Sequence, residues 1–431
     1  MFCGGPMSQL LDTLVQHFRA QGPMALLESQ SADHPASSTS YLAAQPKASI
    51  KAWNEKIEIK AAKEHRTFRD DPWSALSDFR AQQGDWLCGY LGYDLKNHIE
   101  KGYSKNEDPL GAPDLFFMVP KTLIKVDTLT GELTLIKGEL PDLQDQCNQP
   151  GKLEIKGLRS GMTRSDYISM VKCAKHEIYE GDYYEINLSH QLQAAFEGDP
   201  FALYKKMRAV GPVPFGSFLQ VDDFSVCSLS PERFLRKMDK TVFSQPIKGT
   251  MKRDAKQDTD EKLRQRLIES AKNRAENLMI VDLVRNDLSR IATKGSVQVA
   301  DLFEIQTFGT VHQMVSTVTA QTDVKNPIQI IKACYPMGSM TGAPKIRVMQ
   351  SIEKFENYRR GIYSGAIGYL APNGDFDFNV VIRTAIIKND LLCYAVGGAI
   401  TGDSDPADEW DETWLKAKAI TESLQASAKR F

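Results

Sequence analysis

The sequence lacks several features of membrane proteins and nucleic-acid-binding proteins. No run approaches the roughly 18 consecutive apolar residues of a membrane-spanning helix, and the N-terminus shows no basic segment followed by an apolar one. The formal net charge is −2, and Lys and Arg form no dense block. A broad cationic surface is therefore not expected, and we predict neither nucleic acid nor membrane as a partner. An anionic substrate would need a local cationic pocket.

Paired cysteines are also missing. The seven cysteines are scattered along the chain, form no CxxC pair and leave one over in any full pairing scheme. Such a set is typical of free thiols in a reducing compartment. We therefore expect the protein to be cytoplasmic.

The composition is that of a soluble globular enzyme, with 42% hydrophobic and 25% charged residues. A chain of 431 residues exceeds the size at which single cores usually stop growing, so we expect a bilobal domain or two domains that share an interface. Sequence patterning weakens between about Pro141 and Gly161. The boundary is placed there, with an N-terminal region at 1–155 that packs on a catalytic domain at 160–431.

Hydrophobic periodicity predicts both helices and strands. Apolar residues recur at helical spacing in three stretches, residues 8–20, 165–180 and 258–291. A fourth helix is predicted to begin at about residue 406. Strand-like runs surround residues 86–93 and 115–125 and dominate 183–250. Because these elements do not alternate strictly as strand, helix, strand, we predict an α+β layered sandwich.

Two adjacent strand-like segments carry a glutamate and a lysine that could share a site. Residues 228–235 and 241–250, joined by a turn near Asp239, are typical of a β-hairpin, which could bring Glu232 close to Lys248. Lys248 lies between an isoleucine and a glycine, where desolvation could lower the pKa of the amine toward its neutral, nucleophilic form. The alternative is an ordinary solvated lysine at a strand end, which is the commoner case.

Three glutamates could provide oxygen ligands for a metal. Asp405 and Pro406 are typical of the N-cap and first residue of a helix, which then carries Glu409 and Glu412 on adjacent turns of one face. Glu276 lies in the predicted helix AENLMIVDLVRND. Mg²⁺ prefers one or two such carboxylates together with waters and substrate oxygens. The alternative is that the acids near residue 405 only complement the helix dipole.

Several other segments could bind an anion. The loop GSMTGAPK at 338–345 leads into a helix, with Pro344 suited to its first turn, and free backbone N–H groups there could hold a carboxylate. A turn that requires glycine explains the loop equally well. The pair Gly397 and Gly398, which follows the predicted apolar strand LLCYAV, allows the same two interpretations. Arg383, inside the apolar strand predicted by the run NVVIRTAII, needs either a bound carboxylate or an internal ion pair. His312 by itself is more often a hydrogen-bonded core or surface residue.

In their sequences and their order along the chain, these motifs resemble those of the chorismate-utilising enzymes, the family that includes the large subunits of anthranilate synthase and aminodeoxychorismate synthase. The resemblance is strong from about Gly161 to the C-terminus and weak in the N-terminal third, where LLES at 26–29 carries most of it. The motifs are SPERFL at 230–235, QPIKGT at 245–250, AENLMIVDLVRND at 275–287, GSMTGAPK at 338–345, RRGIYSGAIGY at 359–369 and DEWDET at 408–413.

This resemblance implies a layered α/β/β/α sandwich of two facing, mainly antiparallel sheets with helices outside. Chorismate would then bind between the sheets against Mg²⁺. The resemblance assigns a role to each matching position: Glu276 and Glu412 bind Mg²⁺ with help from Glu409; Tyr363 and Arg383 bind the enolpyruvyl carboxylate; Thr341, Gly397 and Gly398 cradle the substrate; and His312 lies near the ring substituents that are displaced.

Position 248 separates the branches of this family. Anthranilate and isochorismate synthases carry PIAGT, whereas aminodeoxychorismate synthases carry PIKGT, as this chain does. The resemblance then implies that Lys248 attacks C2 of chorismate and expels the 4-hydroxyl with help from Glu232. Ammonia adds at C4 and releases the lysine, giving 4-amino-4-deoxychorismate for 4-aminobenzoate and folate synthesis. Anthranilate synthase is the alternative enzyme, and a non-catalytic ligand sensor is the alternative of another class.

Two departures from the family pattern concern Glu185 and the N-terminal pocket. Glu185 stands where ammonia-using relatives usually have glutamine and isochorismate synthases have a lysine base, so water is not expected as the nucleophile. No glutaminase signature is present, and ammonia is expected from a separate glutamine amidotransferase subunit or from free ammonium. Glu28, Ser29 and Tyr41 resemble part of a tryptophan pocket, although the arginine-containing continuation found in relatives is missing.

Overall fold

The computed structural model describes residues 6–30, 38–61, 64–100, 102, 104–142, 153–308 and 311–423. Every strand pairing in this part of the chain is antiparallel, and the pairings divide into two sheets that share the long strands β2 (Thr39–Trp53) and β6 (Leu115–Asp127). The register of β2 against β6 shifts between Pro46 and Ala48. Each of these strands therefore contributes one end to each sheet.

The first sheet contains the C-terminal strands and the start of the chain. Its order is β8 (Leu153–Ser160), β9 (Glu185–Gly198), β21 (Leu391–Ile400), β20 (Thr384–Lys388), β11 (Phe224–Ser230), β10 (Phe215–Val221), β1 (Met24–Glu28), β2, β6 and β7 (Leu133–Lys137). The short β17 (Gly342–Ala343) pairs with the first two residues of β9.

The second sheet starts from the other ends of β2 and β6. Its order is β4 (Glu64–Arg69), β3 (Lys56–Ala61), β2, β6, β5 (Leu87–Leu91), β18 (Ala366–Leu370), β19 (Phe376–Asn379), β12 (Arg233–Met238), β13 (Thr241–Gln245) and β16 (Val311–Gln321). β14 (Ile247–Lys252) follows β13 along the same edge of β16, and β15 (Gln298–Thr307) pairs with its opposite edge.

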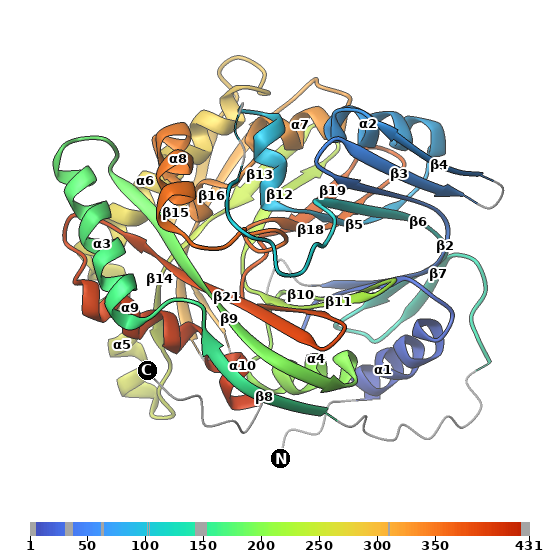
Figure 1. Ribbon diagram of the computed structural model, residues 1–431, viewed down its shortest axis with the longest axis horizontal. Helices are drawn as coiled ribbons and strands as arrows, with labels where there is room; N and C mark the ends of the chain where they lie inside the picture. Colours follow the sequence, from blue (N-terminus) through green and yellow to red (C-terminus); the bar gives the residue numbers. More distant parts are fainter. Residues whose placement is uncertain are drawn as a thin grey trace.

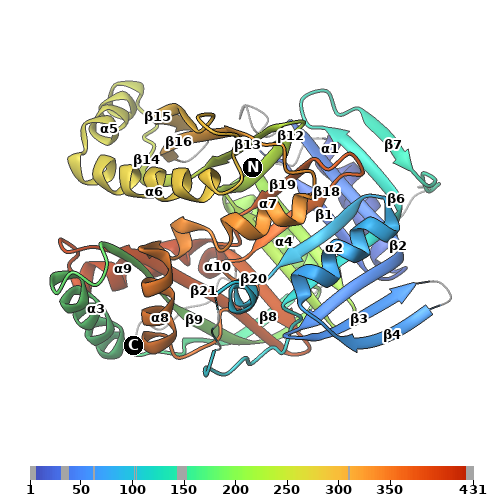
Figure 2. The ribbon, with the colours of Figure 1, turned by 90° about the horizontal axis from the view of Figure 1, so that it is seen from above.

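Helices cover the outer face of each sheet, as Figures 1 and 2 show. The first sheet is covered by α1 (Pro6–Arg19), α3 (Arg164–Tyr179), α4 (Pro200–Val210), α8 (Lys345–Phe355), α9 (Pro406–Lys416) and α10 (Lys418–Ser423). The second is covered by α2 (Pro72–Gln83), α5 (Gln257–Glu269), α6 (Ala271–Ser289) and α7 (Pro327–Cys334). The 3₁₀ turns η1 (Tyr93–His98) and η2 (Gly338–Met340) complete the regular elements in this part of the chain.

Three apolar cores match this layering. In β11, Phe224 and Val226 face a central core between the sheets, whereas Cys227 and Leu229 face the helices of the first sheet. A separate core lies between the second sheet and its helices. Because such strands are buried on both faces, they are apolar almost throughout rather than alternating with polar residues. The predicted α/β/β/α sandwich is confirmed.

Most predicted elements are present, with local differences. The helical stretch 258–291 is two helices, because Ser270 ends α5 and caps α6, accepting a hydrogen bond from the Asn273 backbone N–H. The strand-rich stretch 183–250 also contains α4. β1 pairs with β10 and β5 with β18, so the regions 1–155 and 160–431 contribute to the same sheets. Part of the predicted boundary lies outside the described residues. No helix in the described ranges is long and apolar enough to cross a bilayer.

Candidate active site

Lys248 lies at an irregular point of β14. The pairing register with β16 shifts between Ile247 and Thr250, and Gly249 has a φ of +88°, which glycine adopts without strain. A β-carbon at position 249 would also lie 2.9 Å from the side chain of Asn273 on α6. At this bulge the Lys248 side chain is 10% exposed, so it is not the solvated lysine of the alternative interpretation.

A carboxylate from the other sheet holds the Lys248 ammonium. Lys248 Nζ lies 2.6 Å from Oε1 of Glu185, the first residue of β9, which is 1% exposed. Burial lowers the pKa of Lys248, but the charge and hydrogen bond of Glu185, with smaller contributions from Glu276 and Glu232, raise it overall. The predicted lowering of the Lys248 pKa is therefore wrong for this state, because desolvation is outweighed by the ion pair.

Glu232 lies in the link between β11 and β12 and is 6% exposed. Burial raises the pKa of Glu232 to about 7, although a hydrogen bond from Ser339 and the positive charges of Lys248 and Arg383 act to lower it. Lys248 and Glu232 thus influence each other's pKa, as expected if the hairpin brings them into one neighbourhood. A carboxyl group with this pKa is partly protonated near neutral pH and can act as a general acid.

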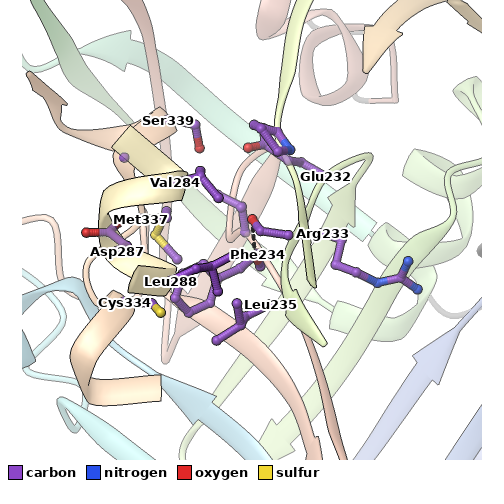
Figure 3. A pocket seen from close by; sticks show the side chains of 14 residues that line it. Glu232, Arg233, Phe234, Leu235, Val284, Asp287, Leu288, Cys334, Met337 and Ser339 are labelled. Carbon is purple, nitrogen blue, oxygen red and sulfur yellow. Dashed lines mark hydrogen bonds between the residues drawn. The ribbon is translucent and has the colours of Figure 1, made fainter. Parts of the chain in front are cut away.

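A small cavity adjoins Glu232. Figure 3 shows Glu232 and Ser339 on its wall, where they face apolar side chains from α6 and β12. These apolar residues are Val284, Leu288, Phe234 and Leu235. The guanidinium of Arg233 points away from them, toward Asp377, with which it forms an ion pair. The apolar wall explains why burial dominates the pKa of Glu232.

The three candidate metal ligands come from two helices. Asp405 caps α9, its side chain accepting the backbone N–H groups of Ala407 and Asp408, and Pro406 is the first helical residue, which confirms the predicted start. Glu409 and Glu412 follow on α9, and Glu276 lies on α6. Negative charge on Glu412 raises the pKa of both other glutamates, in addition to the larger effect of burial.

Two lysines lie against these carboxylates. Lys416 Nζ lies 2.7 Å from Glu412 Oε1 and donates a hydrogen bond of 2.9 Å to the carbonyl oxygen of Gly397, while Lys272 lies 3.9 Å from Glu276. Lys416 lowers the pKa of Glu412. No three carboxylate, histidine or cysteine side chains of the described ranges are grouped closely enough to hold a metal by themselves. The donor chemistry nevertheless fits Mg²⁺, which needs only one or two carboxylates when substrate oxygens complete its shell.

Arg383 lies at a bend rather than in the strand that the sequence suggested. β19 ends at Asn379, β20 begins at Thr384, and Arg383 has a φ of +51°. Burial lowers the pKa of Arg383, while Tyr394 and Glu232 act in the opposite direction. No carboxylate within the described part of the chain forms an ion pair with it. The internal ion pair of the alternative interpretation is therefore not present among the described residues, and anion binding by Arg383 stays a prediction.

The other predicted substrate contacts lie on neighbouring segments. Tyr363 is buried, with its ring 5.9 Å from the Arg360 guanidinium. Thr341 is buried, and its hydroxyl donates to the Met337 carbonyl oxygen, 3.1 Å away. Pro344 caps α8 rather than occupying its first turn. The predicted anion site at this helix start stays a prediction.

Gly397 and Gly398 continue β21 rather than follow it. A β-carbon on Gly397 would lie 2.4 Å from the Leu188 carbonyl oxygen of β9, and one on Gly398 would lie 3.2 Å from Glu409 Oε2 and 4.0 Å from Glu412 Oε1. The pair therefore serves close approach rather than a turn. Gly398 leaves space beside two of the candidate metal ligands.

His312 is held by hydrogen bonds on both ring nitrogens. Nδ1 lies 3.0 Å from Thr307 Oγ1, and Nε2 lies 2.9 Å from Oδ1 of Asp260, a residue of α5 that also binds Arg253. Within the described residues, its hydrogen bonds thus go to this network rather than to Lys248 or Glu232. Its proposed place near the substrate ring stays a prediction.

The three residues of the predicted tryptophan pocket do line one pocket. Glu28, Ser29 and Tyr41 share it with residues of β10, β18 and β19. Glu28 accepts hydrogen bonds from Tyr204 and Arg208 of α4 at 2.6 and 2.8 Å, and the Tyr41 ring packs 4.9 Å from that of Tyr369. Ligand binding in this pocket stays a prediction.

Sequence reasoning missed three interactions in the site. It singled out Glu185 but not its bond to Lys248, and it did not consider Ser339 or Lys416. The spacing of Lys416, four residues after Glu412 on a predicted helix, could have indicated that pair. The bond between Glu185 and Lys248 joins two sheets, and no local pattern reports it.

This fold is that of a known enzyme class. Residues 22–422 match the family model described as chorismate binding enzyme, so the chain belongs to this family. Among its relatives is aminodeoxychorismate synthase component 1 of Escherichia coli, with 32% identity over 420 residues that cover 93% of each chain.

Two further comparisons extend this result. Aminodeoxychorismate synthase of Streptomyces griseus is 44% identical over 280 residues, which are 64% of this chain and 38% of the relative; the aligned part thus spans well under half of that protein. The crystal structure of anthranilate synthase component I from Streptococcus pneumoniae superposes with a TM-score of 0.77 at 28% identity, covering 90% of this chain and 93% of that one.

Proposed function

We propose that this protein is the large subunit of an aminodeoxychorismate synthase, which converts chorismate and ammonia to 4-amino-4-deoxychorismate. The observation that carries the proposal is Lys248, a buried lysine that lies among Glu185, Glu232 and Glu276. A lysine held there can serve as a covalent nucleophile. Relatives named aminodeoxychorismate synthase support this assignment.

In the first step, the Lys248 amine attacks C2 of chorismate, both ring double bonds shift by one position toward C4, and the C4–O bond breaks. The departing hydroxyl takes a proton from Glu232 and leaves as water. In the second step, ammonia attacks C4, both double bonds shift back, and the bond between C2 and the lysine nitrogen breaks. Two allylic displacements thus replace one direct displacement, and each needs a correctly placed proton.

The remaining residues bind the substrate. Arg383, which has no ion pair among the described residues, and Tyr363 would bind the enolpyruvyl carboxylate, and Thr341, Gly397 and Gly398 would line the ring. Mg²⁺ held by Glu276 and Glu412, with Glu409, would neutralise a substrate carboxylate when bound. Lys416 would have to release Glu412 for this. His312 would act from beside the substituents that leave.

The partner that supplies ammonia would be a glutamine amidotransferase subunit, a proposal consistent with the component 1 naming of several relatives. Free ammonium would serve in its absence. The product would feed synthesis of 4-aminobenzoate and folate. The pocket that contains Glu28, Ser29 and Tyr41 would be a regulatory site for an amino acid such as tryptophan, which calorimetric titration with tryptophan would test.

Product analysis separates this proposal from anthranilate synthase, the other activity found among similar proteins. The purified chain is incubated with chorismate, ammonium and Mg²⁺. We expect a product that becomes 4-aminobenzoate only after a lyase is added. Direct release of pyruvate and fluorescent anthranilate would identify the other enzyme, and absence of turnover would favour a ligand-sensing role.

Intact mass after acid quench tests the nucleophile. Native protein with chorismate and Mg²⁺, but without ammonium, should gain the mass of the dehydrated substrate. Lys248→Ala should not gain it. Lys252→Ala is the matched control, because it removes an exposed lysine from the same strand; this variant should form the adduct normally.

A further inference from the structure

The ion pair between Lys248 and Glu185 connects two elements that are distant in sequence and in the sheets. Glu185 begins β9 of the first sheet, and Lys248 lies on β14 of the second. Nζ and Oε1 are 2.6 Å apart, and both residues are more than nine-tenths buried. This hydrogen bond is short enough for a proton to pass directly between the two groups.

Glu185 has little other stabilisation for its negative charge. Its second oxygen, Oε2, is buried and has no hydrogen-bond partner among the described residues. Buried carboxylates normally accept several hydrogen bonds, which offset the loss of hydration. A buried carboxylate with a single donor keeps most of the free-energy cost of that loss. If Lys248 gave up its proton to solvent, Glu185 would be left as a buried anion without that donor. A proton is therefore expected to remain on the pair.

Three other acidic side chains lie close enough to Lys248 to interact with its charge. Glu276 faces it from α6, Glu232 from the link before β12, and Glu412 from α9. Only Glu185 lies within 4 Å of Nζ among the described carboxylates. Its position, rather than its residue type alone, singles it out as the proton acceptor.

We propose that Glu185 is the base that activates Lys248, by taking the proton of the ammonium along the bond between Nζ and Oε1. This inference rests on the proposed function. The products of the transfer are a neutral amine and a neutral carboxylic acid. The amine then forms its bond to C2 while Glu232 protonates the departing hydroxyl. When the lysine later leaves C2, the acid returns its proton to the nitrogen, so the pair regains its starting state without exchange with solvent.

Single-turnover adduct formation tests this role. Native protein and Glu185→Gln are mixed with chorismate and Mg²⁺, without ammonium, and quenched at a series of times between about pH 5.5 and 7. The native rate should be nearly constant across this range, because the proton stays within the pair. Glutamine keeps the size of the side chain but cannot accept the proton, so Lys248 must lose it to water, and the rate should fall about tenfold for each pH unit toward acid.

Two further variants make the result specific. Glu185→Asp retains a carboxylate and should restore the flat pH profile, even if the rate is lower. Glu197→Gln makes the same change at an exposed position on β9 and should behave as the native protein does. Thermal unfolding of each variant shows whether it is folded.

Three outcomes would count against the inference. A Glu185→Gln profile that superimposes on the native one would overturn the role of Glu185 and leave the lysine nucleophile intact. A Glu185→Asp profile as steep as that of Glu185→Gln would show that the carboxylate does not carry the effect. Absence of any adduct in the native protein would overturn both this inference and the proposed nucleophile.

Discussion

Glu232→Gln tests the general acid through two independent measurements. The pKa of Glu232 is raised to about 7, chiefly by burial, and only its protonated form can donate to the departing hydroxyl. Adduct formation should therefore fall about tenfold per pH unit above about pH 7 in the native protein. The rate of adduct formation should be about 10²- to 10⁴-fold lower in the glutamine variant, and it should show no such fall above about pH 7.

The same pKa has a consequence for stability. Between the ordinary pKa of 4.5 and about 7, the folded protein keeps a proton on Glu232 that the unfolded chain releases, so the free energy of unfolding falls as pH rises. The full difference between these two pKa values corresponds to about 3 kcal/mol in the free energy of unfolding. Most of it is lost between pH 5 and 8, which for a chain of this length is a drop of about 3 °C in melting temperature.

The assay is calorimetry of native and Glu232→Gln protein at pH 5 and pH 8. Relative to the native protein, the variant should be more stable at pH 8 than at pH 5 by that margin, because it has no carboxyl group to ionise. Glu197→Gln, exposed on β9, serves as the control. Identical pH dependence in native and variant proteins would refute the raised pKa. If the residual rate of adduct formation in the variant still fell above about pH 7, the general acid would be another group.

Further substitutions test the anion and metal sites. Arg383→Gln should raise the KM for chorismate about 10- to 100-fold through loss of charge-assisted hydrogen bonds. It should not lower the melting temperature, since it removes a partly buried charge that has no ion pair in the described part of the chain. The exposed control Arg159→Gln should change neither quantity, and an unchanged KM for Arg383→Gln would contradict the assignment. Gly398→Ala would place a methyl group 3.2 Å from Glu409 Oε2 and should weaken Mg²⁺ activation several-fold in titrations, whereas Gly211→Ala, with no atom near its β-carbon, should not. Lys416→Met removes the cation that competes for Glu412, so Mg²⁺ should bind more tightly in the variant. Weaker Mg²⁺ binding would show instead that Lys416 supports the site.

Local patterns were sufficient for the elements that carry the site. The period of apolar residues located α3 and α6, and the pairing of Asp405 with Pro406 located the start of α9, because capping and proline geometry act over a few residues. Motif order then gave the family. The same patterns could not find the break at Ser270, since both helices keep apolar residues at compatible spacing.

Pattern reasoning failed where distant segments meet. It placed Arg383 in a strand because the surrounding residues are apolar, and it placed Gly397 and Gly398 after one because glycine often marks a turn. The structure puts the arginine at a bend between β19 and β20 and the glycines within β21. In each case the deciding factor is what packs against the segment, which local propensity does not contain.

The sequence by itself determined which chemical groups this protein possesses: one lysine in the motif QPIKGT, the glutamates of three motifs and an arginine in an apolar run. Tertiary structure decided their state. Burial and ion pairs depend on neighbours from other elements. The approach of the two sheets, which brings Glu185 within 2.6 Å of Lys248, holds the resting lysine as an ammonium, and burial against apolar side chains of α6 and β12 makes Glu232 a weak acid near neutral pH.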